Sequence, residues 1–180
     1  MGEEAAKDHH QQQWSGGVEA TLPRTPPSAA WARVAGAAFF AAHLYLPGID
    51  VCERVADAGD VRHVASSASG MWARERLLET DHAARRLRYA VVDSNMGFGR
   101  YVATLRVVDL EEDGGGGGGG HGGGCRIVWG FECDAVRGGG ERWSEAAMVA
   151  RLGDSVKGMA ERVQRAVAEE EEEGEGGVAA

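Results

Sequence analysis

One long apolar stripe near the C-terminus constrains what this chain of 180 residues can fold into. From Trp143 to about Ala168, apolar residues recur every three or four positions, which predicts an amphipathic helix. The stripe consists of Val149, Leu152, Val156, Met159, Val163 and Val167. The segments before it alternate apolar and polar residues, as strands with one buried face do. That sheet face needs a cover, and this stripe is the only long one in the sequence.

The order of the predicted elements is a strand, two short helices, a run of further strands and then the long helix. The strands are predicted at Trp14–Leu22, Ile49–Ala56, Asp60–Ser66, Met71–Glu79, Arg86–Asp93, Gly99–Leu110 and Cys125–Val136. The short helices are predicted at Pro27–Ala35 and Ala37–Tyr45, with Thr25 as N-cap and Pro26 at the first helical position. We therefore expect an α+β fold in which a curved antiparallel sheet of about seven strands grips the C-terminal helix. The space between them is a natural ligand cavity.

The ends of the chain and one internal loop differ in composition from the rest. Residues 1–13 are polar and predict a disordered leader, and the acidic stretch 169–180 predicts a disordered tail. Between them, 14–168 forms a single domain with a glycine-rich loop insertion at 114–124. Loop closure costs little per added residue, so this insertion is expected to be a tolerated surface loop.

Composition excludes several classes of function. The net charge is −9, and no basic patch with interleaved aromatic residues appears, so no nucleic-acid partner is expected. No apolar run reaches membrane length, so we expect no membrane insertion and a cytoplasmic protein. The three cysteines lack paired spacing, and Cys125 and Cys133 are expected to be small buried side chains. His121 stands alone among glycines. We therefore predict neither a metal nor a cofactor.

Glu75 is the first candidate for a functional residue. In a strand, alternate side chains share a face, so Met71, Ala73, Glu75 and Leu77 lie on one side and the arginines around them on the other. Glu75 then sits in the middle of the less charged face. A carboxylate is costly to bury unless a partner pairs with it, and charges so placed are often functional.

Short motifs are distributed along the chain in a specific order and spacing. They are Trp14-Ser15-Gly16-Gly17-Val18, Leu22-Pro23, Ala30-Trp31, Leu46-Pro47, Val51-Cys52-Glu53, Val61-Arg62-His63-Val64, Trp72-Ala73-Arg74-Glu75-Arg76-Leu77, Tyr101-Val102-Ala103-Thr104 and Trp129-Gly130-Phe131-Glu132-Cys133. Through these motifs the chain resembles the lachrymatory-factor-synthase-like proteins of plants over roughly residues 14–168. Those proteins belong to the helix-grip (START-like) superfamily of polyketide cyclases/dehydrases, lipid-transport domains, pollen allergens and abscisic acid receptors.

The resemblance implies a catalytic pair, Arg62 and Glu75. In the lachrymatory enzymes the glutamate shuttles a proton on a bound sulfenic acid, the arginine holds the ligand oxygen, and the product is a thial S-oxide. It further implies substrate-binding positions in the cavity wall, which match Tyr89, Tyr101, Trp129 and Leu152. The expected partner is therefore a small hydrophobic ligand.

Other interpretations of the same residues stay open. Arg62 and Glu75 also fit a purely structural ion pair. The cavity also fits a carrier or sensor of a small apolar ligand without catalysis, or an interaction protein in which the pocket is incidental. An abscisic acid receptor is disfavoured, because Ala-Ser-Ser-Ala-Ser-Gly at 65–70 replaces the receptor gate and no lysine lies near Asp50 or Val51.

Deleting Gly114–Gly120 tests the loop interpretation. We expect the melting temperature to change by no more than a few degrees, because shortening a flexible loop alters closure entropy only slightly. Thermal unfolding followed by circular dichroism measures this change, and a collapse of stability would contradict the interpretation.

Overall fold

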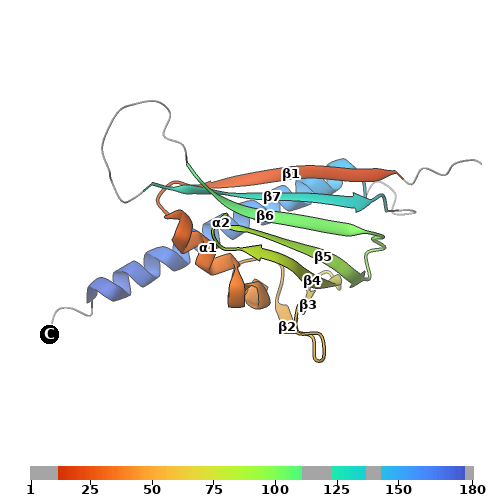
Figure 1. The fold of residues 1–180 in the computed structure, drawn as a ribbon, viewed down its shortest axis with the longest axis horizontal. Coiled ribbons are helices and arrows are strands. Elements are labelled where there is room, and N and C mark those ends of the chain that lie inside the picture. Colours follow the sequence, from red (N-terminus) through yellow and green to blue (C-terminus); the bar gives the residue numbers. More distant parts are fainter. Residues whose placement is uncertain (1–11, 111–122, 137–142, 177–180) are drawn as a thin grey trace, which may run out of the picture.

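The computed structural model describes residues 12–110, 123–136 and 143–176 and contains one sheet, two short helical segments and one long helix (Figure 1). The strands are β1 (Gln13–Leu22), β2 (Val51–Arg54), β3 (Val61–Ala65), β4 (Trp72–Asp81), β5 (Arg86–Ser94), β6 (Tyr101–Asp109) and β7 (Cys125–Asp134). The helices are α1 (Pro27–Val34), the 3-10 helix η1 (Gly36–Leu44) and α2 (Glu145–Gly176). This architecture confirms the predicted α+β fold with a seven-stranded sheet.

The sheet is an open antiparallel meander of β2 to β7, to which the first strand adds beside β7. The strand order is β1-β7-β6-β5-β4-β3-β2, so each strand from β2 to β7 pairs with its neighbour in the sequence. Strand β1 instead pairs with β7, which places Trp14 opposite Cys133. Helix α2 crosses one face of the sheet obliquely (Figure 1). The two edges of the sheet are therefore β1 and β2.

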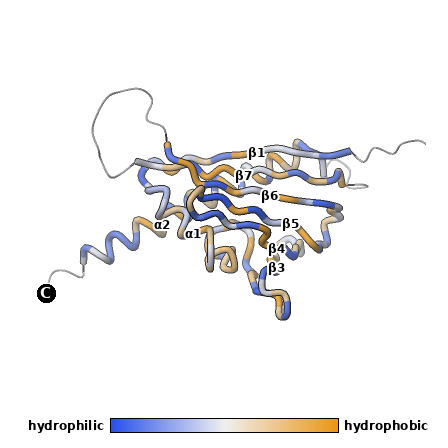
Figure 2. Tube along the Cα trace, in the orientation of Figure 1, coloured by the Kyte–Doolittle hydropathy of each residue, from blue (hydrophilic) through white to orange (hydrophobic). Residues whose placement is uncertain are grey.

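The core lies between that face of the sheet and α2. In β6 and β7 alternate residues are buried, as the period of a strand requires. Hydrophobic and hydrophilic residues interchange along the strands of the sheet (Figure 2). The buried residues of α2 are Met148, Leu152, Val156, Met159, Ala160, Val163 and Val167. Each large apolar side chain buried in this way contributes about 1.5–3 kcal/mol. The C-terminal stripe is thus the cover for the apolar face, as its periodicity predicts.

Two glycines allow α2 to approach its neighbours closely. A Cβ on Gly16 in β1 would come within 2.6 Å of Val149 on the helix. A Cβ on Gly158 in the helix would come within 2.6 Å of Pro47, which follows η1. Glycine weakens a helix by about 1 kcal/mol, so at Gly158 the close contact offsets a local cost.

The start of α1 corrects one prediction. Thr25 is not the N-cap, and Pro26 is not the first helical residue. Pro26 takes the N-cap position with an extended backbone (φ −60°, ψ 143°), and the helix begins at Pro27. The ring of Pro27 disfavours a helical conformation at the residue before it, so the helix cannot start earlier. Thr25 is instead buried in the core.

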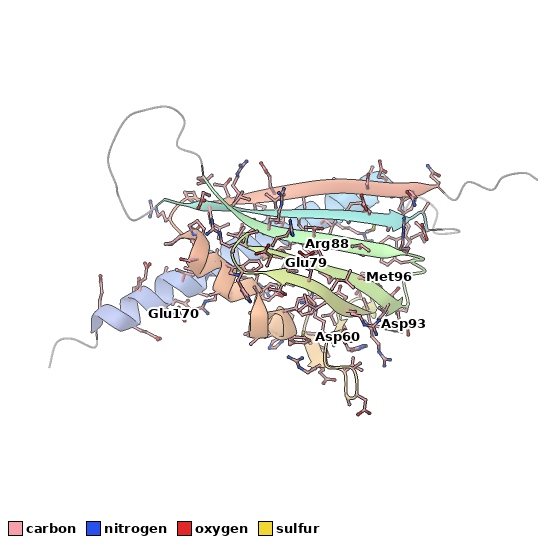
Figure 3. All side chains as sticks on the ribbon, viewed as in Figure 1. Asp60, Glu79, Arg88, Asp93, Met96 and Glu170 are labelled. Carbon is pink, nitrogen blue, oxygen red and sulfur yellow. The ribbon has the colours of Figure 1, made fainter. Side chains whose placement is uncertain are left out.

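The end of α2 also differs from the prediction. The helix continues through the acidic run to Gly176 rather than stopping at Ala168, so 169–176 is helical and not a disordered tail. Alanine and glutamate are good helix formers, and these residues extend a helix that packing has already nucleated. One ion pair, between Arg33 of α1 and Glu170, ties this extension to the body (Figure 3). The predicted leader and glycine-rich loop lie largely outside the described residues, and Gln13 already belongs to β1.

The three cysteines provide a test of the packing. Cys125 and Cys133 are buried as predicted, and burial raises the pKa of each thiol to about 11, while Cys52 is partly exposed.

Because the thiolate is the reactive form, we expect a disulfide reagent at pH 8 to modify Cys52 in the native protein and the other two cysteines only after unfolding. Cys52→Ser should remove the fast reaction. Equal rates for all three thiols in the native protein would contradict the burial of Cys125 and Cys133.

Candidate functional site

A cavity of about 210 Å³ lies between the sheet and α2. Most of its lining is apolar or aromatic. The side chains come from β3 to β7, the β3–β4 and β5–β6 loops, the segment between η1 and β2, and the stretch from Trp143 into α2. The lining residues are Leu46, Pro47, Ile49, Val64, Ser66, Met71, Trp72, Ala73, Glu75, Tyr89, Val91, Met96, Phe98, Tyr101, Trp129, Trp143, Met148, Arg151, Leu152 and Ser155. Such a wall, with a few polar groups, suits a small apolar molecule.

Arg62 and Glu75 form a buried ion pair behind this cavity. The two residues are directly opposed on β3 and β4. Nε and Nη2 of Arg62 both lie 2.6 Å from the same carboxylate oxygen, Oε2 of Glu75. The arginine is 2% exposed. A pair of this kind must satisfy its charges internally, because water does not reach the guanidinium.

The other hydrogen bonds of Arg62 run to the segment around η1. Its Nη1 donates to the carbonyl oxygen of Phe39 at 2.6 Å and to the Tyr45 hydroxyl at 3.1 Å. The guanidinium also stacks over the Phe39 ring, 3.8 Å from its centroid. Burial, the largest single influence, would lower the pKa of Arg62, but the combined effect of Glu75, Tyr45 and Tyr89 outweighs it and the pKa is raised. Arg62 therefore stays charged and is held entirely by protein groups.

Glu75 presents its second oxygen differently. Its side chain is 12% exposed and lines the cavity. Among the described residues, only Oε2 accepts hydrogen bonds, which leaves Oε1 as the oxygen available to a ligand. Arg62 thus holds the carboxylate of Glu75 in place through Oε2 and leaves Oε1 without a hydrogen bond from the described residues.

Two β-bulges flank the stretch of β4 and β5 that carries Glu75. The register shifts between Arg74 and Glu75, where Val92 of β5 is the extra residue, and between Leu77 and Glu79, where Leu78 is the extra residue. Bulges bend a strand and re-aim its side chains, and they are common beside functional sites. Both extra residues point outward, at 45% and 47% exposure for Val92 and Leu78.

Two phenol groups stand in the cavity wall near the carboxylate. Burial raises the pKa of Tyr89 and of Tyr101, and the negative charge of Glu75 raises both further. Both hydroxyls therefore remain protonated at physiological pH and can donate a hydrogen bond.

Trp129 supplies a further donor. Its Nε1 is buried and has no hydrogen-bond partner among the described residues. The indole lies near enough to Tyr89 to oppose weakly the rise in the pKa of that phenol, but the contact falls short of hydrogen-bond geometry. A buried N–H without a partner is costly, so this donor suits an acceptor on a ligand.

The structure brings most of the predicted site residues together. Glu75, Tyr89, Tyr101, Trp129 and Leu152 all line the cavity. Arg62 does not line it, although we expected it to point into the cavity. Arg62 instead lines a second, much smaller cavity, together with Phe39 and Tyr45.

Sequence reasoning missed several residues around the site. The partners of Arg62, Phe39 and Tyr45, belong to η1 and the residue after it, a segment with no clear periodicity. Trp143 and Arg151 line the cavity from the start of α2. The sequence offered a hint only for Arg151, which directly precedes Leu152, a member of the apolar stripe.

Two other features bear on the class of protein. Over residues 12–110, 123–136 and 143–176, no group of three or more histidine, cysteine or acidic side chains is arranged to bind a metal ion. Over the same ranges, no helix combines the length and apolar character that crossing a bilayer requires.

The family model for polyketide cyclase / dehydrase and lipid transport matches residues 14–168, which is nearly the whole of the domain. The chain belongs to this family. Its members are associated with small hydrophobic ligands, in agreement with the apolar cavity.

Solved structures share the fold of this polyketide cyclase/dehydrase family member. The protein XoxI from Bacillus cereus superposes with a TM-score of 0.62 at 18% identity, covering 86% of this chain and 94% of that one. Norcoclaurine synthase from Thalictrum flavum superposes with a TM-score of 0.61 at 16% identity, covering 88% of each chain. An uncharacterised protein from Bacillus thuringiensis gives 0.60 at 17%, covering 86% of this chain and 98% of that one. At such identities the likeness shows the fold alone.

Replacing Arg62 tests its structural role. We expect Arg62→Ala to lower the free energy of unfolding by about 3–5 kcal/mol, because it leaves Glu75 without its buried partner. Arg88→Ala is the matched control, since Arg88 pairs loosely with Glu79 across the exposed face (3.9 Å, Figure 3) and should cost less than about 1 kcal/mol. Urea denaturation measures both. Equal losses in the two variants would contradict a structural role for the buried pair.

Proposed function

We propose that this protein binds a small, largely apolar molecule in the cavity and that Glu75 transfers a proton on it. One observation carries the proposal: a carboxylate stands in an aromatic wall with Oε2 locked by Arg62 and Oε1 free. A carboxylate held in this way can act as a base and then return the proton as an acid. The result is an isomerisation that needs no cofactor.

The polar groups near Glu75 suit the rest of such a reaction. Proton removal leaves negative charge on the substrate, and fixed hydrogen-bond donors stabilise it. The hydroxyls of Tyr89 and Tyr101 and the Nε1–H of Trp129 are donors of this kind. Arg62 would have to release Phe39 or Tyr45 to serve as one, so we assign it the positioning of Glu75.

A sulfenic acid is the first substrate to test, because the chain resembles the lachrymatory-factor-synthase-like proteins. In an alkenyl sulfenic acid, Glu75 would take the proton from the S–O–H group and deliver it to carbon. The O–H bond breaks, a C–H bond forms, and the C=C bond gives way to C=S, so the product is a thial S-oxide and no oxidant is consumed.

The fold supports binding of small aromatic molecules as well. The norcoclaurine synthase structure of the same fold holds dopamine and hydroxybenzaldehyde. Mass spectrometry of the small molecules that the purified protein retains would therefore identify the ligand class before any assay of turnover.

Glu75→Gln tests catalysis directly. It keeps the shape of the side chain and removes the proton carrier, so turnover of a sulfenic acid generated in situ should fall by about 10²–10⁴-fold while ligand affinity changes little. Glu79→Gln is the matched control, because it makes the same change on the same strand but at the exposed face (Figure 3). Undiminished turnover in Glu75→Gln would overturn the catalytic role.

A carrier without catalysis is the second candidate. The engagement of Arg62 by protein groups favours it, because this guanidinium is then not available to bind a ligand in the cavity. In that case Glu75→Gln would leave function intact, and filling the cavity with Leu152→Trp would abolish binding.

A further inference from the structure

A second charged side chain, Arg151, lies at the outer end of the cavity. It projects from the first part of α2 and belongs to the cavity lining. Its guanidinium stacks on Trp143, 4.7 Å from the ring centroid, and its Nη1 lies 4.0 Å from the sulfur of Met71. Both contacts are themselves lining residues. Arg151 is exposed, so its guanidinium borders both the cavity and the solvent.

The positive charge of Arg151 has no acidic partner among the described residues. Among the described residues that line the cavity, Glu75 is the only acidic one, and the buried Arg62 already neutralises it. Asp154 lies one turn further along α2 but makes no ion pair with Arg151. The cavity thus carries one uncompensated positive charge, within a chain whose net charge is −9.

Two hydroxyls belong to the same cavity lining. Ser155 follows Arg151 by four residues on α2 and so lies on the same face of the helix. Ser66 lines the cavity from the loop after β3. Together with the guanidinium they add hydrogen-bond donors to a lining that is otherwise mostly apolar or aromatic.

We propose that the ligand is an amphipathic anion, with its apolar body in the cavity and a carboxylate or similar oxyanion on Arg151 at the mouth. A guanidinium matches such a group with two parallel hydrogen bonds, and it remains charged at all relevant pH values. This inference rests on the proposed binding of an apolar molecule in the cavity and narrows its class. A simple alkenyl sulfenic acid has no such anion, so the substrate would carry one at the end opposite the reacting group.

Two fluorescent probes of similar shape separate charge from apolarity. These are 1-anilinonaphthalene-8-sulfonate, which is anionic, and N-phenyl-1-naphthylamine, which lacks the sulfonate. We expect Arg151→Gln to weaken binding of the anionic probe by about fivefold and of the neutral probe by less than about twofold, the scale of a partly exposed ion pair. Added salt should weaken only the anionic probe.

Two further variants complete the design. Arg165→Gln makes the same charge change on the same helix outside the cavity lining and should alter neither probe. Leu152→Trp fills the cavity and should weaken both, with circular dichroism confirming the fold. Equal losses of both probes in Arg151→Gln, or an equal loss of the anionic probe in Arg165→Gln, would overturn the role of Arg151. Failure of the neutral probe to bind the wild type, or its undiminished binding to Leu152→Trp, would overturn the proposed function and this inference with it.

Discussion

The buried guanidinium of Arg62 joins the parts of the molecule on which the site depends. It binds the carboxylate of Glu75 on β4, the carbonyl oxygen of Phe39 in η1 and the hydroxyl of Tyr45 just after that helix. One side chain of β3 therefore connects the sheet to the helical segment that closes this end of the core. A buried ion pair gains little net free energy over a packed apolar core, since desolvation consumes most of the attraction. Its contribution here is the fixed position of a carboxylate that water would otherwise surround.

The same arrangement divides the cavity into regions of different chemistry. One part of the wall holds a carboxylate, two phenols and an indole N–H, all in a setting where electrostatic interactions are strong. At the outer end, Arg151 and two serines meet solvent. Apolar side chains of both the sheet and α2 separate the two ends. A bound molecule would therefore be aligned by its ends and not only by its shape.

The sequence predicted the parts of this structure that depend on regular periodicity. Strand alternation placed Glu75 on the inner face, and the spacing of the stripe in α2 identified the cover and Leu152. It did not predict what depends on tertiary contact. The partners of Arg62 come from η1, where no repeat marks Phe39 or Tyr45. The end of α2 was misplaced because the acidic composition suggested solvation, whereas a helix that packing has nucleated extends through residues with high helix propensity.

The two bulges in β4 and β5 allow the curvature of the sheet to change without a change in which residues pair around Glu75. Leu78 and Val92 are each the unpaired residue of a bulge, so every pairing partner around Glu75 is already defined without them. A deletion of either residue would straighten the strands while leaving Glu75 opposite Val91 and on the inner face. Changes in chain length at these two exposed positions, and not substitutions in the wall, are thus a route by which evolution can widen or narrow the cavity while keeping its carboxylate in place.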